Sequence, residues 1–139
     1  MDMLRSLNWQ QKSGIGYTVS RRADGGMNLV FTDLLDATLA DWREFAFEHL
    51  MGSDRLTRNL YDLRDVQDIS QKAIKMAVEV NSDPSTRNLR VAVLVASDAA
   101  REAIMDVAAG AVASGAAIRI FTSMAEAEAW LMRSMEQII

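Results

Sequence analysis

The sequence predicts a single α/β domain with a mixed, mostly parallel five-stranded sheet and about four helices. Three observations predict this class. Residues 24–26 (DGG) separate two extended runs, which is typical of a β-hairpin, because such a turn needs positive φ and glycine supplies it without steric cost. Helical and extended patterns then alternate along the chain. Residues 89–96 (LRVAVLVA) are almost continuously apolar, as expected for a strand covered by helices on both faces.

The first half of the chain begins with the hairpin. Strands are predicted at 17–22 and 27–32, on either side of the turn. A helix is predicted from Thr38, where Thr38 and Asp41 form a capping box. Its apolar positions recur at helical spacing, and Gly52 is the expected C-terminal stop.

The second half repeats a strand–helix pattern. A short strand within 55–63 precedes a helix from about Ser70 to Val80, which ends before Pro84 because proline disfavours helical conformation for the residue before it. The strand at 89–96 is followed by a helix from Ser97 to about Ser114. Such repeats predict parallel strands joined by right-handed crossovers.

The end of the chain contains one more strand and one more helix. Residues 117–122 (AIRIFT) form the strand, and Ser123 with Glu126 forms a second capping box. In the helix that follows, one face is expected to hold Ala127, Trp130, Leu131, Ser134 and Ile138. We expect residues 1–14 to be a flexible lead-in and residues 15–139 to form the domain.

The composition narrows the function classes. The 139 residues are half hydrophobic, which suffices for a core, and the absence of cysteine excludes disulfides, thiolate metal sites and a cysteine nucleophile. A net charge of −4 without a basic block disfavours nucleic acid, and the pair Arg21–Arg22 is interpreted as a solvated strand end. No apolar run has the length of a membrane span, and residues 1–9 lack the apolar region of a signal peptide, so a cytoplasmic location is expected.

Residues suited to catalysis are few. His49 is the one histidine, so no multi-histidine metal site is available, and its place on an apolar helical stripe favours a partly buried structural role. Gly14 and Gly16 precede a strand and do not join a strand to a helix, so they do not form a phosphate loop. We therefore predict a non-enzyme with no cofactor and no metal.

The most polar strand–helix crossing is the candidate site, because ligands of open α/β sheets bind at the carboxyl ends of strands. Its residues are Asp62, Arg64, Asp65, Asp68, Ser70 and Gln71. Three nearby carboxylates suit a divalent cation. Asp and Ser, however, also satisfy the unpaired amides at a helix start, and Arg64 supplies a counter-charge, so capping is the preferred interpretation.

The layout as a whole is similar to a known family. The hairpin, the Asp62–Leu63 strand end, the strand at 90–95 and the closing residues 119–121 with Ala127-x-x-Trp130-Leu131 resemble a STAS domain of the SpoIIAA-like branch. STAS domains occur in sulfate transporters and anti-sigma-factor antagonists, and many SpoIIAA-like members are small single domains with no assigned function. The resemblance covers about residues 15–135. It implies a SpoIIAA-like fold and a binding or regulatory module.

The resemblance also bears on phosphorylation. Phosphorylatable STAS antagonists carry Asp-Ser-(Ser/Ala/Gly)-Gly where this strand meets this helix, and the first serine accepts the phosphate. Aligned on that pattern, Ser70 stands at the aspartate, Gln71 at the acceptor and Ala73 at the glycine, so the motif is absent. A shift of one residue in the alignment would instead place Ser70 at the acceptor.

Two functions compete under this resemblance. The first is protein–protein interaction through residues 64–76, with a homodimer among the open alternatives. The second is binding of a small apolar ligand or lipid, since SpoIIAA-like folds resemble lipid-binding SEC14 domains. Side chains that would line such a pocket are Met27, Phe31, Trp42, Phe45, Met76 and Trp130. At helix or strand spacing such residues are more often plain core.

Overall fold

The computed structural model describes residues 12–49, 57–66, 69–81, 89–102, 104–105 and 117–133. Their strands form one sheet in the order β1-β2-β3-β4-β5. Only β1 and β2 are antiparallel, and the other neighbours are parallel. The strands are β1 (Tyr17–Arg21), β2 (Met27–Phe31), β3 (Thr57–Asp62), β4 (Leu89–Leu94) and β5 (Ala117–Phe121). The mixed, mostly parallel sheet predicted from the sequence is therefore confirmed.

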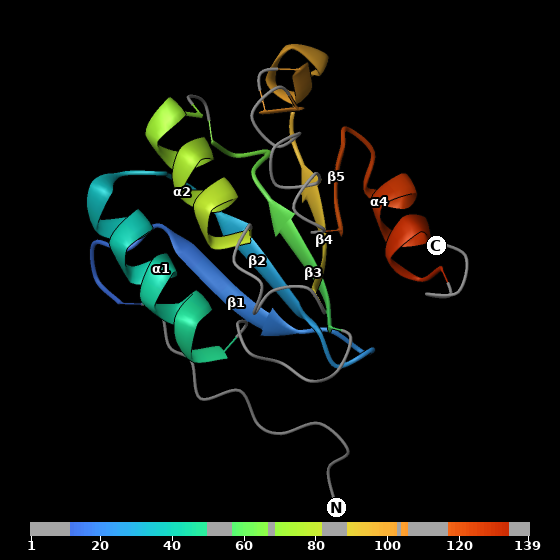
Figure 1. Cartoon of the computed structure of the whole chain (residues 1–139), viewed down its shortest axis with the longest axis horizontal. Helices are drawn as coiled ribbons and strands as arrows, with labels where there is room; N and C mark the ends of the chain where they lie inside the picture. The colour runs from blue at the N-terminus through green and yellow to red at the C-terminus, as the bar shows by residue number, and fades with distance from the viewer. Residues whose placement is uncertain are drawn as a thin grey trace, which may run out of the picture.

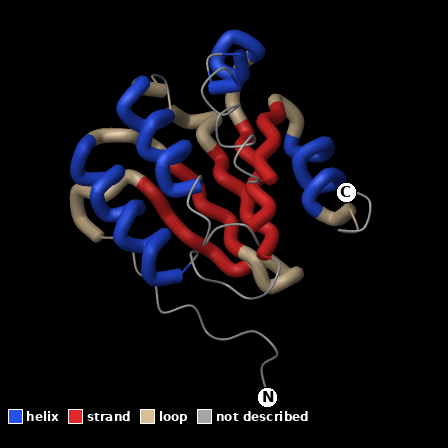
Figure 2. The backbone as a smooth tube through the Cα atoms, viewed as in Figure 1, coloured by secondary structure: helices blue, strands red, loops and turns tan. Residues whose placement is uncertain are grey.

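Helices cover both faces of this sheet. They are α1 (Asp36–His49), α2 (Gln71–Asn81) and α4 (Met124–Leu131), and residues 98–102 and 104–105 are also helical. Figure 1 shows α1 and α2 side by side on one face, with α4 on the other. The tube in Figure 2 shows the same layers, with the strands between the helices. None of the helices in the described ranges has the length and apolarity needed to cross a bilayer.

The hairpin between β1 and β2 has the predicted turn. Gly25 has φ of 94°, in the left-handed region that favours glycine. The Gly25 N–H donates to the Arg22 carbonyl at 3.0 Å, and the Arg22 N–H donates to the Gly26 carbonyl at 2.8 Å. Gly26 packs so closely on the Arg58 carbonyl of β3 that a Cβ atom there would collide with it. The turn thus fixes β1 and β2 and also allows β3 to approach.

Side chains of the sheet alternate between two core layers. On β3, Tyr61 packs in the cluster with α1 and α2, whereas Leu60 packs in the cluster with α4. On β4, Val91 belongs to the first layer and Leu94 to the second, and Leu94 is fully buried. Val93 is partly buried against the α1–α2 layer. The prediction that β4 is an interior strand covered on both faces is confirmed.

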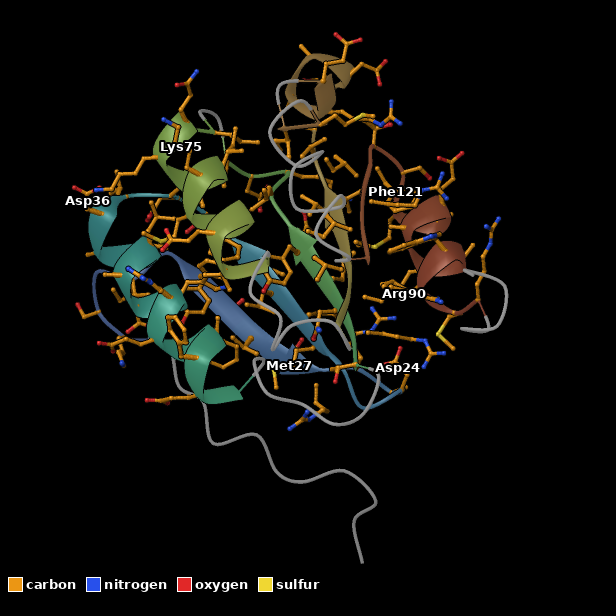
Figure 3. The ribbon with its side chains drawn as sticks, in the orientation of Figure 1. Asp24, Met27, Asp36, Lys75, Arg90 and Phe121 are labelled. Atoms are coloured by element: carbon orange, nitrogen blue, oxygen red, sulfur yellow. The ribbon has the colours of Figure 1, made fainter. Side chains whose placement is uncertain are left out.

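Two arginines hold the C-terminal end of α4 on the sheet. The Arg58 Nε donates to the Leu131 carbonyl at 2.6 Å, and the Arg90 Nη1 donates to the carbonyls of Trp130, Leu131 and Arg133 at 2.9, 3.0 and 2.8 Å. Figure 3 labels Arg90 on the α4 side of the sheet. Burial, with the nearby positive charges of Arg58 and Arg133, lowers the pKa of Arg90. Cations at this position are favoured because carbonyls at a helix C-terminus lack intrahelical partners.

Arg22 corrects one expectation from the sequence. The predicted solvated strand end is wrong for this residue, which is only 7% exposed. Its guanidinium forms a two-pronged ion pair with Glu128 of α4, at 2.6 and 3.0 Å, and also contacts Asp24 and Asn28. Because Glu128 of α4 reaches the turn that follows β1, the arginine is paired and covered.

The start of α1 corrects another expectation. The helix begins at Asp36, so Thr38 is inside it and is not the N-cap. The Thr38 hydroxyl instead donates to Asp33 Oδ1 at 2.6 Å and accepts from the Gly16 N–H at 2.8 Å. Asp33 Oδ1 also accepts from the Leu35 N–H at 3.0 Å. The Thr38 side chain, which the sequence assigns to a helix cap, instead forms a long-range hydrogen bond with Gly16, just before β1. The predicted stop at Gly52 lies outside the described residues.

The terminal helix agrees with its predicted start. Ser123 is its N-cap, and the Ser123 side chain accepts from the Glu126 N–H. Ala127, Trp130 and Leu131 are buried on one face, as predicted. Ser134 and Ile138, predicted on the same face, lie outside the described residues.

Candidate functional site

The crossing between β3 and α2 lies at the carboxyl edge of the parallel strands. β3 ends at Asp62, and α2 begins at Gln71. The Leu63 N–H donates to the Leu94 carbonyl at 2.8 Å, and the Val66 N–H donates back to the Leu63 carbonyl at 3.1 Å. These bonds attach the first part of the loop to β4 and close it into a turn.

Asp62 and Arg64 form a local clamp within that turn. Asp62 Oδ1 accepts from the Arg64 backbone N–H at 3.1 Å and from Arg64 Nε at 3.0 Å, and Oδ2 accepts from Nη2 at 2.8 Å. Burial pushes the pKa of Asp62 upward, but the hydrogen bonds and charge of Arg64 outweigh it, so the net pKa lies below the ordinary value. Asp62 is 9% exposed, and its lone pairs are used to hold the turn.

Ser70 caps the helix that follows. Its Oγ accepts from the Ala73 N–H at 3.1 Å, which satisfies one of the amides without an intrahelical partner at the start of α2. The capping interpretation of Ser70 is confirmed.

Several polar side chains of the crossing point to solvent. Arg64, Asp65, Ser70 and Gln71 are exposed, and Asp68 lies outside the described residues. The next residue, Lys72, forms an ion pair at 2.8 Å with Asp36, the first residue of α1. Figure 3 labels Asp36 there and Lys75 further along α2. We call the exposed set Arg64, Asp65, Ser70, Gln71 and Lys72 the crossing surface.

One large apolar side chain lies exposed close to this surface. Leu35 directly precedes Asp36, the partner of Lys72, and is 67% exposed. An apolar group beside charges of both signs is the composition found where interface cores meet their polar rims.

The remaining candidates for chemistry do not gather here. No group of three His, Cys, Asp or Glu side chains suited to a metal ion occurs among the residues with described positions. His49 is the last residue of α1, and its side chain lies outside the described part. The carboxylate of Asp62 is bound by Arg64, as stated above. In the described ranges, the crossing is thus a held polar loop and not a cluster of reactive groups.

An apolar cavity of about 80 Å³ lies beneath the crossing, between the sheet and the helices on the α1–α2 face. Leu39 and Trp42 of α1 and Ala73 and Ile74 of α2 contribute to its walls, and strands β2 to β5 form its floor. Empty volume enclosed in a protein core costs about 24 cal/mol per Å³, so about 2 kcal/mol is the upper bound for this partly open cavity. Interiors rarely keep such voids, which makes the cavity a feature to explain.

The predicted apolar pocket overlaps only partly with this cavity. Phe31 and Trp42 line it. Met27, Phe45 and Met76 pack in the same core cluster without lining it. Trp130 packs in the separate α4 cluster on the opposite face, because Ala127, Trp130 and Leu131 turn toward the sheet from α4. The sheet lies between Trp130 and the cavity.

Two aromatic residues in the wall carry buried polar atoms. The rings of Trp42 and Tyr61 meet edge to face, with centroids 5.9 Å apart and an interplanar angle of 83°. Burial raises the pKa of Tyr61 far above its ordinary value, and the nearby Trp42 opposes the shift. Trp42 and Tyr61 do not form a hydrogen bond with each other, because Trp42 Nε1 has no hydrogen-bond partner within the described structure. The Tyr61 phenol therefore stays neutral at any physiological pH.

Sequence reasoning missed three residues that close the cavity. Leu34 precedes α1, Leu63 follows β3, and Ile69 precedes α2. All three lie in loops and are partly buried. Isolated apolar residues in loops have no periodicity, so the one available signal was their apolar character within otherwise polar segments.

Comparisons with known proteins address the fold. No protein-family model matches the sequence, and no curated protein matches it either. Among solved structures, the chain is similar to an uncharacterised protein of the DUF3478 family from Shewanella loihica PV-4, described as having a SpoIIAA-like fold. The TM-score is 0.59 at 14% sequence identity, over 88% of this chain and 99% of that chain. This chain has a SpoIIAA-like fold. The fold expected from the family resemblance is therefore confirmed. At 14% identity the similarity shows the fold alone and assigns no activity to this SpoIIAA-like domain.

Proposed function

We propose that this SpoIIAA-like domain is a non-enzymatic binding and regulatory module that engages a protein partner through the crossing surface. The proposal rests on the different roles of the side chains in the crossing, some of which hold the backbone while others are exposed to solvent. Asp62 and Ser70 use their side chains to hold the backbone. Arg64 and Lys72 are exposed members of ion pairs with Asp62 and Asp36, and Asp65 and Gln71 are exposed beside them. Exposed groups of both charges beside a backbone held by these hydrogen bonds are suited to recognition, since less conformational entropy is lost on binding.

The position of the crossing supports the same function. It lies at the carboxyl ends of parallel strands, where α/β folds place their recognition sites. Leu35 adds an exposed apolar group beside it. Because Gln71 occupies the acceptor position of the phosphorylation motif, we propose binding that is constitutive and not controlled by a phosphate at that position.

Site-specific photocrosslinking tests this function. A photoreactive amino acid replaces Gln71 in the full chain, and the matched control carries it at Thr18, an exposed residue of β1. In the source cell we expect a discrete adduct from position 71 and none from position 18. Equal labelling from both positions would contradict the proposal. An adduct formed by the purified chain alone would identify a second copy as the partner.

The absence of turnover is part of the proposal. Phosphatase, esterase and nucleotide-hydrolysis substrates should react at background rates, because Arg64 binds the Asp62 carboxylate and the described residues contain no cluster suited to a metal ion. Turnover that is abolished by Asp62→Asn or His49→Ala would contradict the non-enzyme assignment.

The cavity favours apolar ligand binding as a second candidate function, within a size limit. Pockets for drug-sized ligands occupy about 300–1,000 Å³. A cavity of about 80 Å³ is too small to enclose an acyl chain, so the lipid version of this function has no support from the described cavity.

A further inference from the structure

The cavity and the crossing surface are built from the same stretch of chain. Leu63, Ile69 and Ala73 line the cavity. Three residues of the same stretch are exposed to solvent: Arg64 and Ser70 directly follow the lining residues Leu63 and Ile69, and Gln71 lies two positions from Ile69 and from Ala73. An object inside the cavity would therefore touch the inner side of the segment whose outer side is the crossing surface.

The chemistry of the cavity restricts its occupant. Every described side chain in the wall is aliphatic or aromatic, and the polar atoms of Trp42 and Tyr61 are buried. Apolar walls hold water poorly, because a bound water needs two or more polar partners. An engineered apolar cavity of about 150 Å³ takes up benzene or xenon. At about half that volume, this one accepts a xenon-sized atom directly and a single ring with slight widening.

The cavity can widen at the end where loops close it. Leu34, Leu63 and Ile69 are partly buried and belong to loops, whereas the other walls are regular strands and helices. Loops open locally at lower free energy than core strands. The smallest side chain in the described wall is Ala73, on the first turn of α2.

We propose that this cavity is a binding site for one small, uncharged apolar molecule no larger than about a single ring, which enters between Leu34, Leu63 and Ile69. Occupancy fills the space beside Ala73 and stiffens the crossing from inside. The site is separate from the crossing surface, and its existence does not depend on the protein partner.

Methyl NMR of the full chain with xenon and with benzene tests the site. Saturable shifts are expected for the methyl groups of Ile69 and Ile74, which line the cavity, and not for Leu60 and Leu94, which pack on the α4 face. Backbone amides of the crossing surface should shift together with the cavity methyls. Shifts of equal size on both faces, or no saturation, would overturn the proposal.

Filled variants and a long ligand complete the test. Ala73→Leu, or Ala73→Met if the first variant does not fold, should weaken benzene binding at least tenfold while keeping a dispersed spectrum. Benzene binding unchanged in a folded filled variant would show that the site lies elsewhere. Dodecanoate should fail to displace benzene, and displacement would overturn the size limit.

Discussion

Filling the cavity from α2 should stabilise the protein. Ala73 lines the cavity, and Ala73→Leu adds three carbon atoms where about 80 Å³ is empty. At about 24 cal/mol per Å³, the largest recoverable free energy is about 2 kcal/mol. We expect a gain of about 0.5–2 kcal/mol, because the leucine rotamer will not match the space perfectly. Urea unfolding measures it, and with an m value of about 2 kcal/mol/M each kcal/mol shifts the midpoint by about 0.5 M.

The matched control is the same substitution on α1. Ala46 is fully buried in the core cluster and does not line the cavity. Ala46→Leu should therefore overpack the core and cost about 1–3 kcal/mol. The reasoning is refuted if Ala73→Leu lowers the midpoint as much as Ala46→Leu, since the two sites would then be equally full.

Three further predictions concern the bonds that hold α4 and the crossing. Arg90→Met should cost about 1.5–3 kcal/mol or more in urea unfolding, because three carbonyls at the end of α4 lose a charged donor. The same change at the exposed Arg119 of β5 should cost no more than about 0.5 kcal/mol. Equal costs at the two positions would contradict this role of Arg90. Ser70→Ala should cost about 0.5–2 kcal/mol, and Ser70→Asp should hold or raise stability, because Asp also caps and its charge suits a helix N-terminus; a large loss in Ser70→Asp would argue against the cap. Because the pKa of Asp62 is lowered in the folded state, Asp62 stabilises the fold above its unfolded pKa of about 3.9, and this stability is lost as pH falls through the folded pKa. Asp62→Asn should therefore make the free energy of unfolding less dependent on pH on the acid side. An unchanged slope would contradict the clamp.

The periodicity of the sequence predicted the elements well, because their burial is local and repetitive. The strand at 89–96 has the apolar run of an interior strand, and β4 is interior and covered on both faces. Ser70 and Ser123 stand where a helix needs an acceptor, and both are caps. Asp62 was correctly placed at a strand end, and Arg64 was correctly named as its counter-charge.

Features that depend on distant contacts were not predictable in this way. Arg22 is buried because Glu128 of α4 reaches it from 106 residues further along the chain. Thr38 reads as a local cap, yet its hydroxyl bonds to Gly16 and Asp33. The described walls of the cavity come from strands, helices and loops that are far apart in the sequence, and no local pattern encodes an unfilled volume.

The most direct test of the central claim is the affinity of the partner captured at position 71 for surface variants of the chain. Asp65→Lys and Gln71→Lys change exposed residues of the crossing surface, and Thr18→Lys makes a comparable change on β1. We expect each crossing variant to raise the Kd at least tenfold, equivalent to about 1.4 kcal/mol, while Thr18→Lys leaves it unchanged. Equal Kd values for all three variants and the parent chain would contradict recognition through the crossing surface.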